Sequence, residues 1–324
     1  MAFPVWMLLH LVLAATGTWL ARRYALKKQL LDQPGERRSH AVATPRGGGI
    51  AVVATVSLAI AWLALQGGPE SFLLSCFVIG LVLVAAIGWL DDHRPLPAWP
   101  RLLVHALAAF LLAWGVHDST PGLIAPILAF VLAMVLANIW NFMDGIDGLA
   151  ASQAVIVALA MALLLAGGVW GWIAAGSVAA LAGFLPFNFP KARIFLGDVG
   201  SGALGFLVAG LLAAAFRSDR VAWPLLLLPM SAFLVDAGFT LGMRMLRRER
   251  WWAPHVQHTY QKWAGRNGSH VGVTLAYAGF TLMAAMLVVV GKHWTDYGSA
   301  GICLVWFLGA GFLWARMRRD ISNE

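Results

Sequence analysis

The sequence NIWNFMDGIDGLA, residues 138–150, places four polar side chains directly after a long apolar run. They are Asn138, Asn141, Asp144 and Asp147. Polar groups at the end of a membrane helix are costly unless they serve a site or a pathway, so this stretch is the first candidate for a functional site. On an ideal helix Asp147 would point away from Asn138. We therefore predict that the helix breaks near Gly145 and that both acids face one pocket.

The chain as a whole has the composition of a membrane protein. Its 324 residues are 60% hydrophobic and 12% charged, whereas soluble domains contain about 25% charged residues. Apolar runs close to the length of a membrane-spanning helix recur throughout. The sequence predicts an all-α, polytopic membrane protein with one transmembrane domain (1–324). Its eleven apolar segments are 3–20, 49–65, 71–90, 102–116, 123–143, 152–167, 171–189, 200–216, 223–246, 271–291 and 299–315. The first segment lacks a basic start, so no cleavable signal peptide is expected.

The distribution of Lys and Arg predicts the orientation of the chain in the membrane. When alternate loops are assigned to one side, twenty of these residues fall on that side and three on the other. Short basic loops remain in the cytoplasm, so the N-terminus is expected outside and the C-terminus in the cytoplasm. The net charge of +8 then reflects loops beside anionic lipid, and no nucleic-acid partner is expected. The two cysteines lie in apolar segments and predict no disulfide.

The remaining polar candidates all lie in loops on this predicted cytoplasmic side, near 21–48, 91–101, 144–151, 190–200 and 247–270. In the first of these loops, Arg37, Arg38, His40 and Arg46 have side chains that bind phosphate. Arg46 lies between a proline and three glycines, which favours a ligand contact there, and an ordinary positive-inside flank is an equal alternative.

Two adjacent acids, Asp91 and Asp92, end the third apolar segment. Adjacent carboxylates can bind Mg²⁺, or one can act as a base while the other supports its charge. The alternative is a simple acidic helix end, which the helix macrodipole disfavours. Asn188 lies at the end of the seventh segment and Asp198 follows that segment on the same side, among glycines that allow close approach of a ligand.

The last cytoplasmic loop contains His255 and His258 after a proline. A zinc site would need further strong ligands nearby, so contacts to phosphate are the better interpretation. Five loops thus bring acids, amides, glycines and basic groups to one side of the membrane. A single active site on the cytoplasmic face explains this placement most simply.

The order of these motifs resembles a known family. Asp91-Asp92, then Asn-x-x-Asn-x-x-Asp-Gly-x-Asp-Gly from Asn138, then Asn188 and Phe-Leu-Gly-Asp-Val-Gly-Ser from Phe195 are similar to the polyprenyl-phosphate N-acetylhexosamine-1-phosphate transferases, glycosyltransferase family 4. The resemblance covers nearly the whole chain. It implies transfer of a sugar-1-phosphate from a UDP-N-acetylhexosamine to undecaprenyl phosphate, with release of UMP. It also implies Mg²⁺, with Mn²⁺ as a substitute, and a place in the bacterial inner membrane.

The resemblance further implies roles for individual residues. Asp198 looks like the metal carboxylate, with the Asn138 amide as a weaker candidate ligand. Asp91 resembles the residue that deprotonates or orients the lipid phosphate, and Asp92 supports it. Contacts to the nucleotide, the sugar or their phosphates are implied for Arg46, Asn141, Asp144, Asp147, Asn188, Phe195, His255 and His258. A basic group occupies the place of Arg46 in the family, and Phe195 is similar to an aromatic residue that stacks on uracil.

The histidine loop separates branches of this family. His255-Val-Gln-His258, together with Arg38-Ser-His40 and the Thr-Pro-Arg-Gly-Gly-Gly sequence from Thr44, looks like the branch that initiates O-antigen synthesis. The donor then remains open among UDP-GlcNAc, UDP-FucNAc and UDP-QuiNAc. One alternative is the phospho-N-acetylmuramoyl-pentapeptide transferase of peptidoglycan synthesis. Another, from a different class, is an ion-coupled transporter, which predicts acids at mid-depth or on both faces. A homodimer is an open alternative to a monomer.

Overall fold

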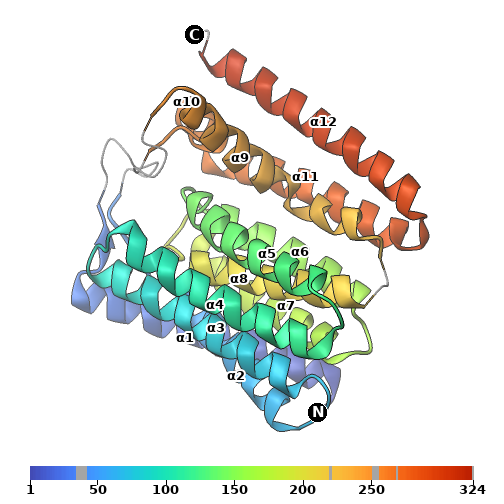
Figure 1. The fold of residues 1–324 in the computed structure, drawn as a ribbon. Coiled ribbons are helices and arrows are strands. Elements are labelled where there is room, and N and C mark those ends of the chain that lie inside the picture. The colour runs from blue at the N-terminus through green and yellow to red at the C-terminus, as the bar shows by residue number, and fades with distance from the viewer. Residues whose placement is uncertain (34–41, 219–220, 250–254, 268, 323–324) are drawn as a thin grey trace.

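The computed structural model describes residues 1–324 except 34–41, 219–220, 250–254, 268 and 323–324. Arg37, Arg38 and His40, considered above as phosphate contacts, lie outside the described residues. Most of the described chain is helical (Figure 1). The helices are α1 (Phe3–Lys28), α2 (Gly49–Leu65), α3 (Ser71–His93), α4 (Ala98–Ser119), α5 (Ile124–Phe142), α6 (Leu149–Leu164), α7 (Val169–Asn188), α8 (Asp198–Arg217), α9 (Ser231–Leu246), α10 (Thr259–Asn267), α11 (His270–Val290) and α12 (Asp296–Ser322).

The predicted all-α membrane architecture is confirmed. Nine helices in the described part of the chain are long and apolar enough to cross a membrane, and the shorter apolar helices are α2 and α6. Each of the eleven predicted apolar segments falls on helical structure. One small exception to the all-α class is a pair of two-residue strands, β1 (Leu31–Asp32) and β2 (Thr44–Pro45), which are antiparallel.

The segment predicted as one helix over 223–246 has two parts. It begins as a 3-10 helix, η1 (Trp223–Met230), and continues as α9; a second short 3-10 helix, η2 (Gly291–His293), follows α11. Pro229 lies inside η1. Proline lacks a backbone N–H and its ring clashes with the preceding turn, which explains why regular α-helix begins only after it.

The central helix of the bundle is α8, which packs against α5 and α3. In the 18-residue apolar stretch of α8, 94% of the residues are buried. The corresponding shares of buried residues in α1 and α12 are 22% and 17%. Small residues make this packing close: a Cβ added to Gly205 would overlap the carbonyl of Leu136. A Cβ at Gly88 of α3 would likewise overlap the backbone of Asp198. The start of α8 is therefore held tightly against the end of α3.

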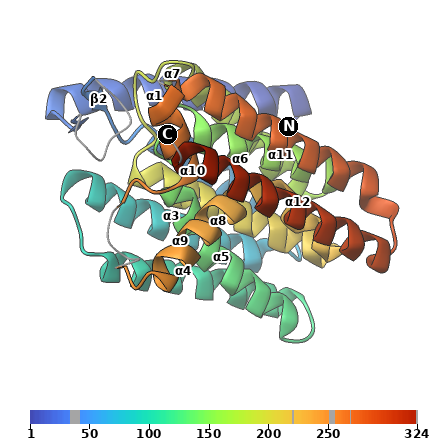
Figure 2. The ribbon, with the colours of Figure 1, turned by 90° about the horizontal axis from the view of Figure 1, so that it is seen from above.

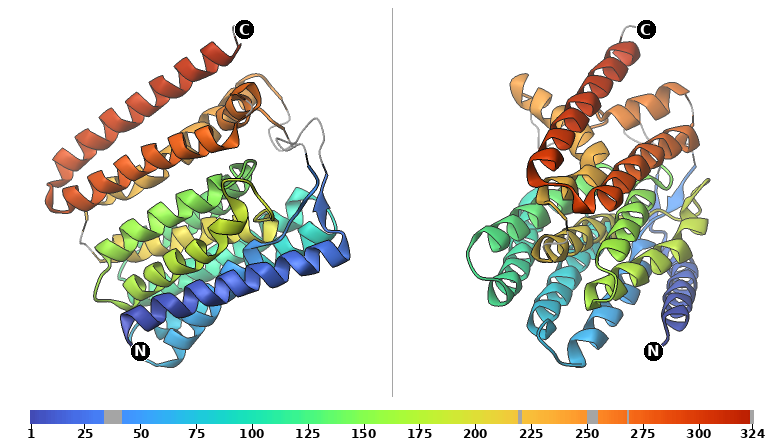
Figure 3. Two further views of the ribbon diagram at one scale, coloured as in Figure 1. Left: turned by 180° about the vertical axis from the view of Figure 1, so that it is seen from behind. Right: turned by 90° about the vertical axis from the view of Figure 1, so that its right-hand side faces the viewer.

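The C-terminal helices form a layer of their own. Figures 1 and 2 show α9, α11 and α12 lying over one side of the bundle made by α1 to α8, with α12 outermost. The two ends of the chain lie at opposite ends of the bundle along the helix direction, which is also seen in the rotated views of Figure 3. The short helix α10 lies at the end where the polar loops gather.

An ion pair closes the opposite end of the bundle. Arg217 Nη1 and Nη2 each donate to a Glu70 carboxylate oxygen at 3.1 Å, and its Nε donates to Thr120 Oγ1 at 2.8 Å. The indole of Trp170 also donates to Glu70. The network joins the segments that contain Arg217, Glu70, Thr120 and Trp170. Arg217, one of the few basic residues at this end of the bundle, is therefore paired within the protein.

Candidate active site

The loop between α1 and α2 runs across the loop between α7 and α8. Phe195 N donates to Pro45 O at 2.8 Å, and Gly48 N donates back to Phe195 O at 2.9 Å. Gly197 has a φ of +77°, and a Cβ there would lie 2.7 Å from Gly47 N. Glycine is needed at Gly197 because the backbone is left-handed and the two loops touch. Arg46 and Phe195 are brought together by this backbone pairing.

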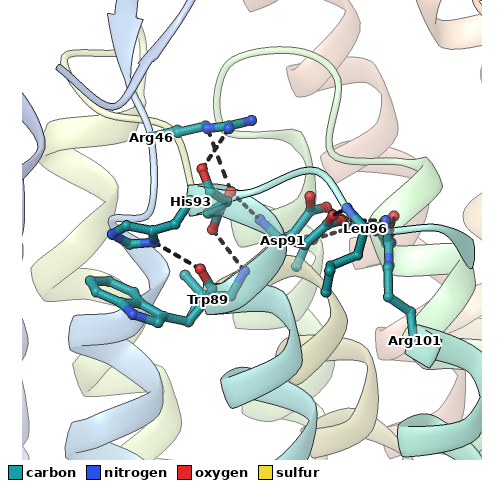
Figure 4. Close-up of polar contacts among 11 residues, drawn as sticks. Arg46, Trp89, Asp91, His93, Leu96 and Arg101 are labelled. Carbon is teal, nitrogen blue, oxygen red and sulfur yellow. Dashed lines mark hydrogen bonds and ion pairs between the residues drawn. The ribbon is translucent and has the colours of Figure 1, made fainter. Parts of the chain in front are cut away.

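Asp92 caps α8 from another helix. Its two carboxylate oxygens accept hydrogen bonds from Asp198 N and Val199 N, both at 3.1 Å. The first N–H groups of a helix have no partner within the helix, and the macrodipole favours a negative charge there. Arg46 Nη2 donates to the backbone carbonyl of Asp92 at 2.5 Å (Figure 4). The Asp92 side chain is only 2% exposed, so its contacts position Asp198.

Asp91 faces a different set of partners. It accepts from Leu96 N at 2.6 Å and pairs with Arg101 Nη1 at 2.5 Å (Figure 4). Arg101 Nη2 donates to Asn141 Oδ1 at 3.0 Å and lies 4.0 Å from a carboxylate oxygen of Asp198. One guanidinium thus connects α3, α4, α5 and α8.

Arg101 was not predicted as a site residue. In the sequence Arg101 is one of the two basic residues of the 91–101 loop, which indicate the orientation of the chain in the membrane. The sequence did contain a signal for it. Arg101 follows Pro100, so its positive charge lies near the N-terminus of a membrane helix. The macrodipole disfavours a cation at that position, so a compensating group of acids was to be expected nearby.

Asn141, rather than Asn138, lies beside Asp198. Asn141 Nδ2 donates to Asp198 Oδ1 at 2.5 Å and to Ser201 Oγ at 2.9 Å. Asn138 Nδ2 instead donates to the backbone carbonyl of Met134 at 2.7 Å. The Asp198 side chain is 30% exposed, compared with 7% for Asp91 and 2% for Asp92, so it is the most accessible of these three carboxylates.

Asp144 lies in the electrostatic field of the same group. Burial raises its pKa well above the usual value, and the negative charges of Asp198 and Asp92 raise it further. Asp144 therefore lies close to other carboxylates, and a group of carboxylates is an environment that a divalent cation stabilises. In the described part of the chain no three acid, histidine or cysteine side chains are arranged as a ready metal cage. Mg²⁺ does not need one, because it binds through one or two carboxylates, waters and substrate phosphates.

The predicted helix break near Gly145 is confirmed, since α5 ends at Phe142 and α6 begins at Leu149. The two acids of this turn have different surroundings. Asp147 accepts from Ala192 N at 3.0 Å and lies 3.0 Å from His270 Nδ1. Its contacts join the turn to the α7–α8 loop and to α11.

Asn188 holds the same turn from α7. Its Oδ1 accepts from Gly148 N at 3.1 Å, and its Nδ2 donates to Ile194 O at 3.0 Å. Its side chain is buried. Asn188 therefore uses both ends of its amide to shape the loop before Phe195.

The histidine loop docks on the end of α5. The buried His258 ring stacks with the rings of Phe142 and Tyr260, at centroid distances of 6.3 Å and 5.9 Å. The Tyr260 hydroxyl donates to Phe142 O at 2.9 Å. The ring centroids of His255 and His258 are 4.9 Å apart. Burial lowers the pKa of His255 to about 4, with a further contribution from His258, so the His255 ring is neutral at pH 7.

Asp236 anchors this loop and was also missed. It accepts from Thr259 N at 2.8 Å and Tyr260 N at 3.1 Å, at the start of α10, and from the Tyr277 hydroxyl at 2.8 Å. The sequence signal was present, because Asp236 is a single acid inside the apolar segment 223–246. Acids at such positions have partners in the protein interior.

The chain matches known proteins over most of this architecture. Residues 74–215 match the model of glycosyl transferase family 4. The phospho-N-acetylmuramoyl-pentapeptide-transferase of Synechococcus sp. is 36% identical, over 68% of this chain and 69% of the relative. The probable undecaprenyl-phosphate N-acetylglucosaminyl 1-phosphate transferase of Bacillus subtilis is 28% identical, over 84% of this chain and 80% of the relative.

A third relative extends over still more of the chain. The undecaprenyl-phosphate alpha-N-acetylglucosaminyl 1-phosphate transferase of Thermotoga maritima is 28% identical, over 87% of this chain and 89% of the relative. The matched family segment contains Asp91, Arg101, Asn141 and Asp198, which the structure brings together at one end of the bundle. The chain belongs to glycosyl transferase family 4.

Proposed function

We propose that this enzyme transfers an N-acetylhexosamine-1-phosphate group from a UDP-sugar to undecaprenyl phosphate and releases UMP. The observation that carries this proposal is the contact of Asp91, Arg101, Asn141 and Asp198, which come from four helices. Asp92 holds Asp198 in this group by capping the N-terminus of α8. The relatives from Bacillus and Thermotoga support an N-acetylglucosaminyl donor and an undecaprenyl phosphate acceptor. We further propose that the product initiates O-antigen synthesis, on the form of the histidine loop.

The proposed membrane arrangement has eleven spans, with the N-terminus outside and the C-terminus and the active site in the cytoplasm. The nine long helices and the shorter α2 and α6 support the number of spans. The excess of basic residues in the loops at the site end supports the orientation. Both substrates can reach a site at this position, because a UDP-sugar is soluble in the cytoplasm and a polyprenyl phosphate is confined to the bilayer.

In the proposed reaction, a phosphate oxygen of the acceptor forms a bond to the sugar-bearing phosphorus. The bond from that phosphorus to the bridging oxygen breaks, and UMP leaves. Mg²⁺, when bound, would offset the charges of the phosphates. Asp198 would hold it, with the Asn138 amide retained as a second candidate ligand. Asp91, positioned by Arg101, would orient the acceptor phosphate, which is mostly ionised at neutral pH because its second pKa is about 6.

The donor contacts are proposed from the remaining residues of the polar end. Asn141 and Asp144 lie with Asp198, where the donor phosphates would bind, and Arg46 adds a positive charge beside Asp92. Phe195 would stack on uracil. Asp147 and Asn188 would act on the nucleotide through the loops that they hold. His255 and His258 would contact the diphosphate as hydrogen-bonding groups, and for His255 as a neutral ring.

A donor screen tests the proposed function. Purified full-length protein is incubated with undecaprenyl phosphate, Mg²⁺ and one radiolabelled donor at a time: UDP-GlcNAc, UDP-FucNAc, UDP-QuiNAc or UDP-N-acetylmuramoyl-pentapeptide. Both the labelled lipid and UMP are measured. We expect equal amounts of labelled lipid diphosphate and UMP with one of the first three donors, and none after EDTA. Transfer from UDP-N-acetylmuramoyl-pentapeptide alone would favour the second candidate, which the 36% identity to the Synechococcus enzyme supports.

Cysteine labelling should place the two ends of the bundle on opposite sides of the membrane. In a background with Cys76 and Cys303 changed to Ala, Val256→Cys lies beside His258 and Lys292→Cys lies at the other end. Both positions are exposed. A membrane-impermeant maleimide applied to intact spheroplasts is expected to label Lys292→Cys and to reach Val256→Cys only after lysis. Labelling of Val256→Cys in intact spheroplasts would reverse the proposed orientation.

Asp147→Ala should act through the loops rather than by removing a direct nucleotide contact. The change removes the carboxylate that accepts from Ala192 N and lies beside His270 Nδ1, which should lower the free energy of unfolding by about 1–3 kcal/mol. We expect a lower Tm in detergent together with weaker UMP binding. Asp118→Ala, an exposed acid at the other end of the bundle, is the control and should leave both unchanged. An unchanged Tm with UMP binding lost would instead make Asp147 a direct contact.

A further inference from the structure

A cavity lies among the C-terminal helices, and Asp91, Asp92 and Asp198 are not among its described lining residues. It has a volume of about 690 Å³ and is lined by residues of α9, α10, α11 and α12, including Leu275, Phe280, Met283, Leu313 and Met317. An apolar groove of about 440 Å³ continues from it along α11 and α12, and the two share Phe280 and Ala310. The volume of the cavity is in the range of small-molecule sites, and its lining is mainly apolar.

The cavity and groove together extend across much of the membrane. On α12 they reach from Gly301 to Asp320, which at 1.5 Å per residue is roughly 28 Å, close to the thickness of the hydrocarbon core. In Figures 1 and 2 α12 is the outermost helix of its layer. These dimensions fit an extended hydrocarbon chain lying parallel to the helices.

Charged groups gather at one end of the cavity. Arg266 of α10 and Asp320 of α12 line it, and Arg266 Nη1 donates to the Asp320 backbone carbonyl at 2.9 Å. Lys262 lies one helical turn before Arg266 on α10. Burial lowers the pKa of Lys262, and the positive charges of Arg318 and Arg247 lower it further, so basic groups surround this part of α10. An anionic group would stabilise such a cluster, and basic pockets between membrane helices bind anionic lipid head groups.

We propose that this cavity binds an anionic phospholipid of the bilayer. An acyl chain would lie between α11 and α12, and the phosphate would bind beside Arg266 and Lys262. The described residues that line the cavity include none of Asp91, Asp92 and Asp198, so a phosphate at Arg266 is not placed for the proposed transfer. The occupant is thus a lipid of the surrounding membrane and not the reacting acceptor.

The site would stabilise the position of the histidine loop. Trp263 and Arg266 of α10 line the cavity, while Tyr260 at the start of the same helix contacts α5. Asp236 also lines the cavity and holds the first amides of α10. A bound lipid would therefore pack against the helix that orients His258.

Lipid retention measured by native mass spectrometry tests the proposal without any assay of transfer. Full-length protein is exchanged into nanodiscs of phosphatidylcholine with 20 mol% phosphatidylglycerol, released, and scored for each bound lipid. Gly279→Leu fills the cavity, because a Cβ at Gly279 meets no atom within 4 Å. Gly238→Leu is the matched control, since Gly238 is equally open but lies outside the cavity.

The wild type and Gly238→Leu are expected to retain phosphatidylglycerol in preference to phosphatidylcholine, and Gly279→Leu is expected to lose that lipid. Arg266→Gln should weaken retention about five-fold, the effect of one basic residue near an anionic head group. Lys292→Gln, which removes an exposed charge at the other end of the bundle, should have no effect.

Four results would overturn the proposal. The first is retention of phosphatidylglycerol by Gly279→Leu equal to that of the wild type, and the second is equal retention of the two lipids by the wild type. If undecaprenyl phosphate added to the same nanodiscs is the lipid that Gly279→Leu loses, the cavity belongs to the acceptor. If Gly279→Leu changes the oligomeric mass and not the bound lipid, the groove is a contact between copies of the chain.

Discussion

Asp198→Asn is expected to lower kcat/KM for transfer by about 10³-fold or more while the protein stays folded, because a bound metal ion contributes several kcal/mol to transition-state stabilisation. Asp198 is the most exposed of the three carboxylates around the α8 N-terminus, and Asn141 holds it in place. The amide retains the size and one acceptor of the carboxylate but not its charge. Steady-state release of UMP at several Mg²⁺ concentrations, together with Tm, measures the effect.

The control for this prediction is Asp296→Asn. Asp296 is also an acid in the first turn of a long helix, but it lies at the start of α12. Both variants lose the favourable interaction with a helix macrodipole, which is worth about 0.3–1 kcal/mol, so their changes in Tm should be similar and small. Turnover of Asp198→Asn at saturating Mg²⁺ equal to that of the wild type would remove Asp198 from the proposed metal site.

Arg101→Gln is expected to lower both stability and activity. Arg101 neutralises Asp91, whose side chain is 7% exposed, at a distance of 2.5 Å. Removing one member of a buried ion pair leaves an uncompensated charge and costs about 3–5 kcal/mol. Because the Arg101 side chain is itself 24% exposed, solvent screening should reduce this to about 2–3 kcal/mol. Chemical unfolding in mixed micelles gives the free energy, and transfer kinetics give kcat.

The double variant Asp91→Asn/Arg101→Gln separates charge balance from catalysis. It removes both charges, so a large part of the lost stability should return, as expected for residues in direct contact. Activity should not return, because the proposed orientation of the acceptor phosphate needs both groups. Additive losses of stability would show that Arg101 does not compensate Asp91, and recovered activity would remove this pair from the proposed mechanism.

Local rules were sufficient for the helices and for the turn at their centre. Apolar segments of membrane length must satisfy their backbone hydrogen bonds internally, so each of them is helical. The break after Phe142 follows from Gly145 and Gly148, since Gly148 has a φ of +71° that few other residues tolerate. The alternation of spans then placed the acids and amides of 138–150 at the same end of the bundle as Asp91 and Asp198.

The partner of each polar group could not be predicted from spacing along the chain. Asp91 and Asp92 are adjacent, yet one pairs with Arg101 and the other caps α8, because successive residues on a helix point about 100° apart and different helices pack on the two sides. The same holds for Arg101 and Asp236, whose partners come from distant helices.

The membrane class, the helical segments, the central turn and the family resemblance can all be predicted from the sequence, since each depends on composition or on residues close together in the chain. The contact of Asn141 with Asp198, the loops held by Asp147 and Asn188, and the position of α10 between the site and a lipid-sized cavity become known only from the folded structure. These features depend on how helices far apart in sequence pack, and close packing through residues such as Gly88 and Gly205 sets those distances.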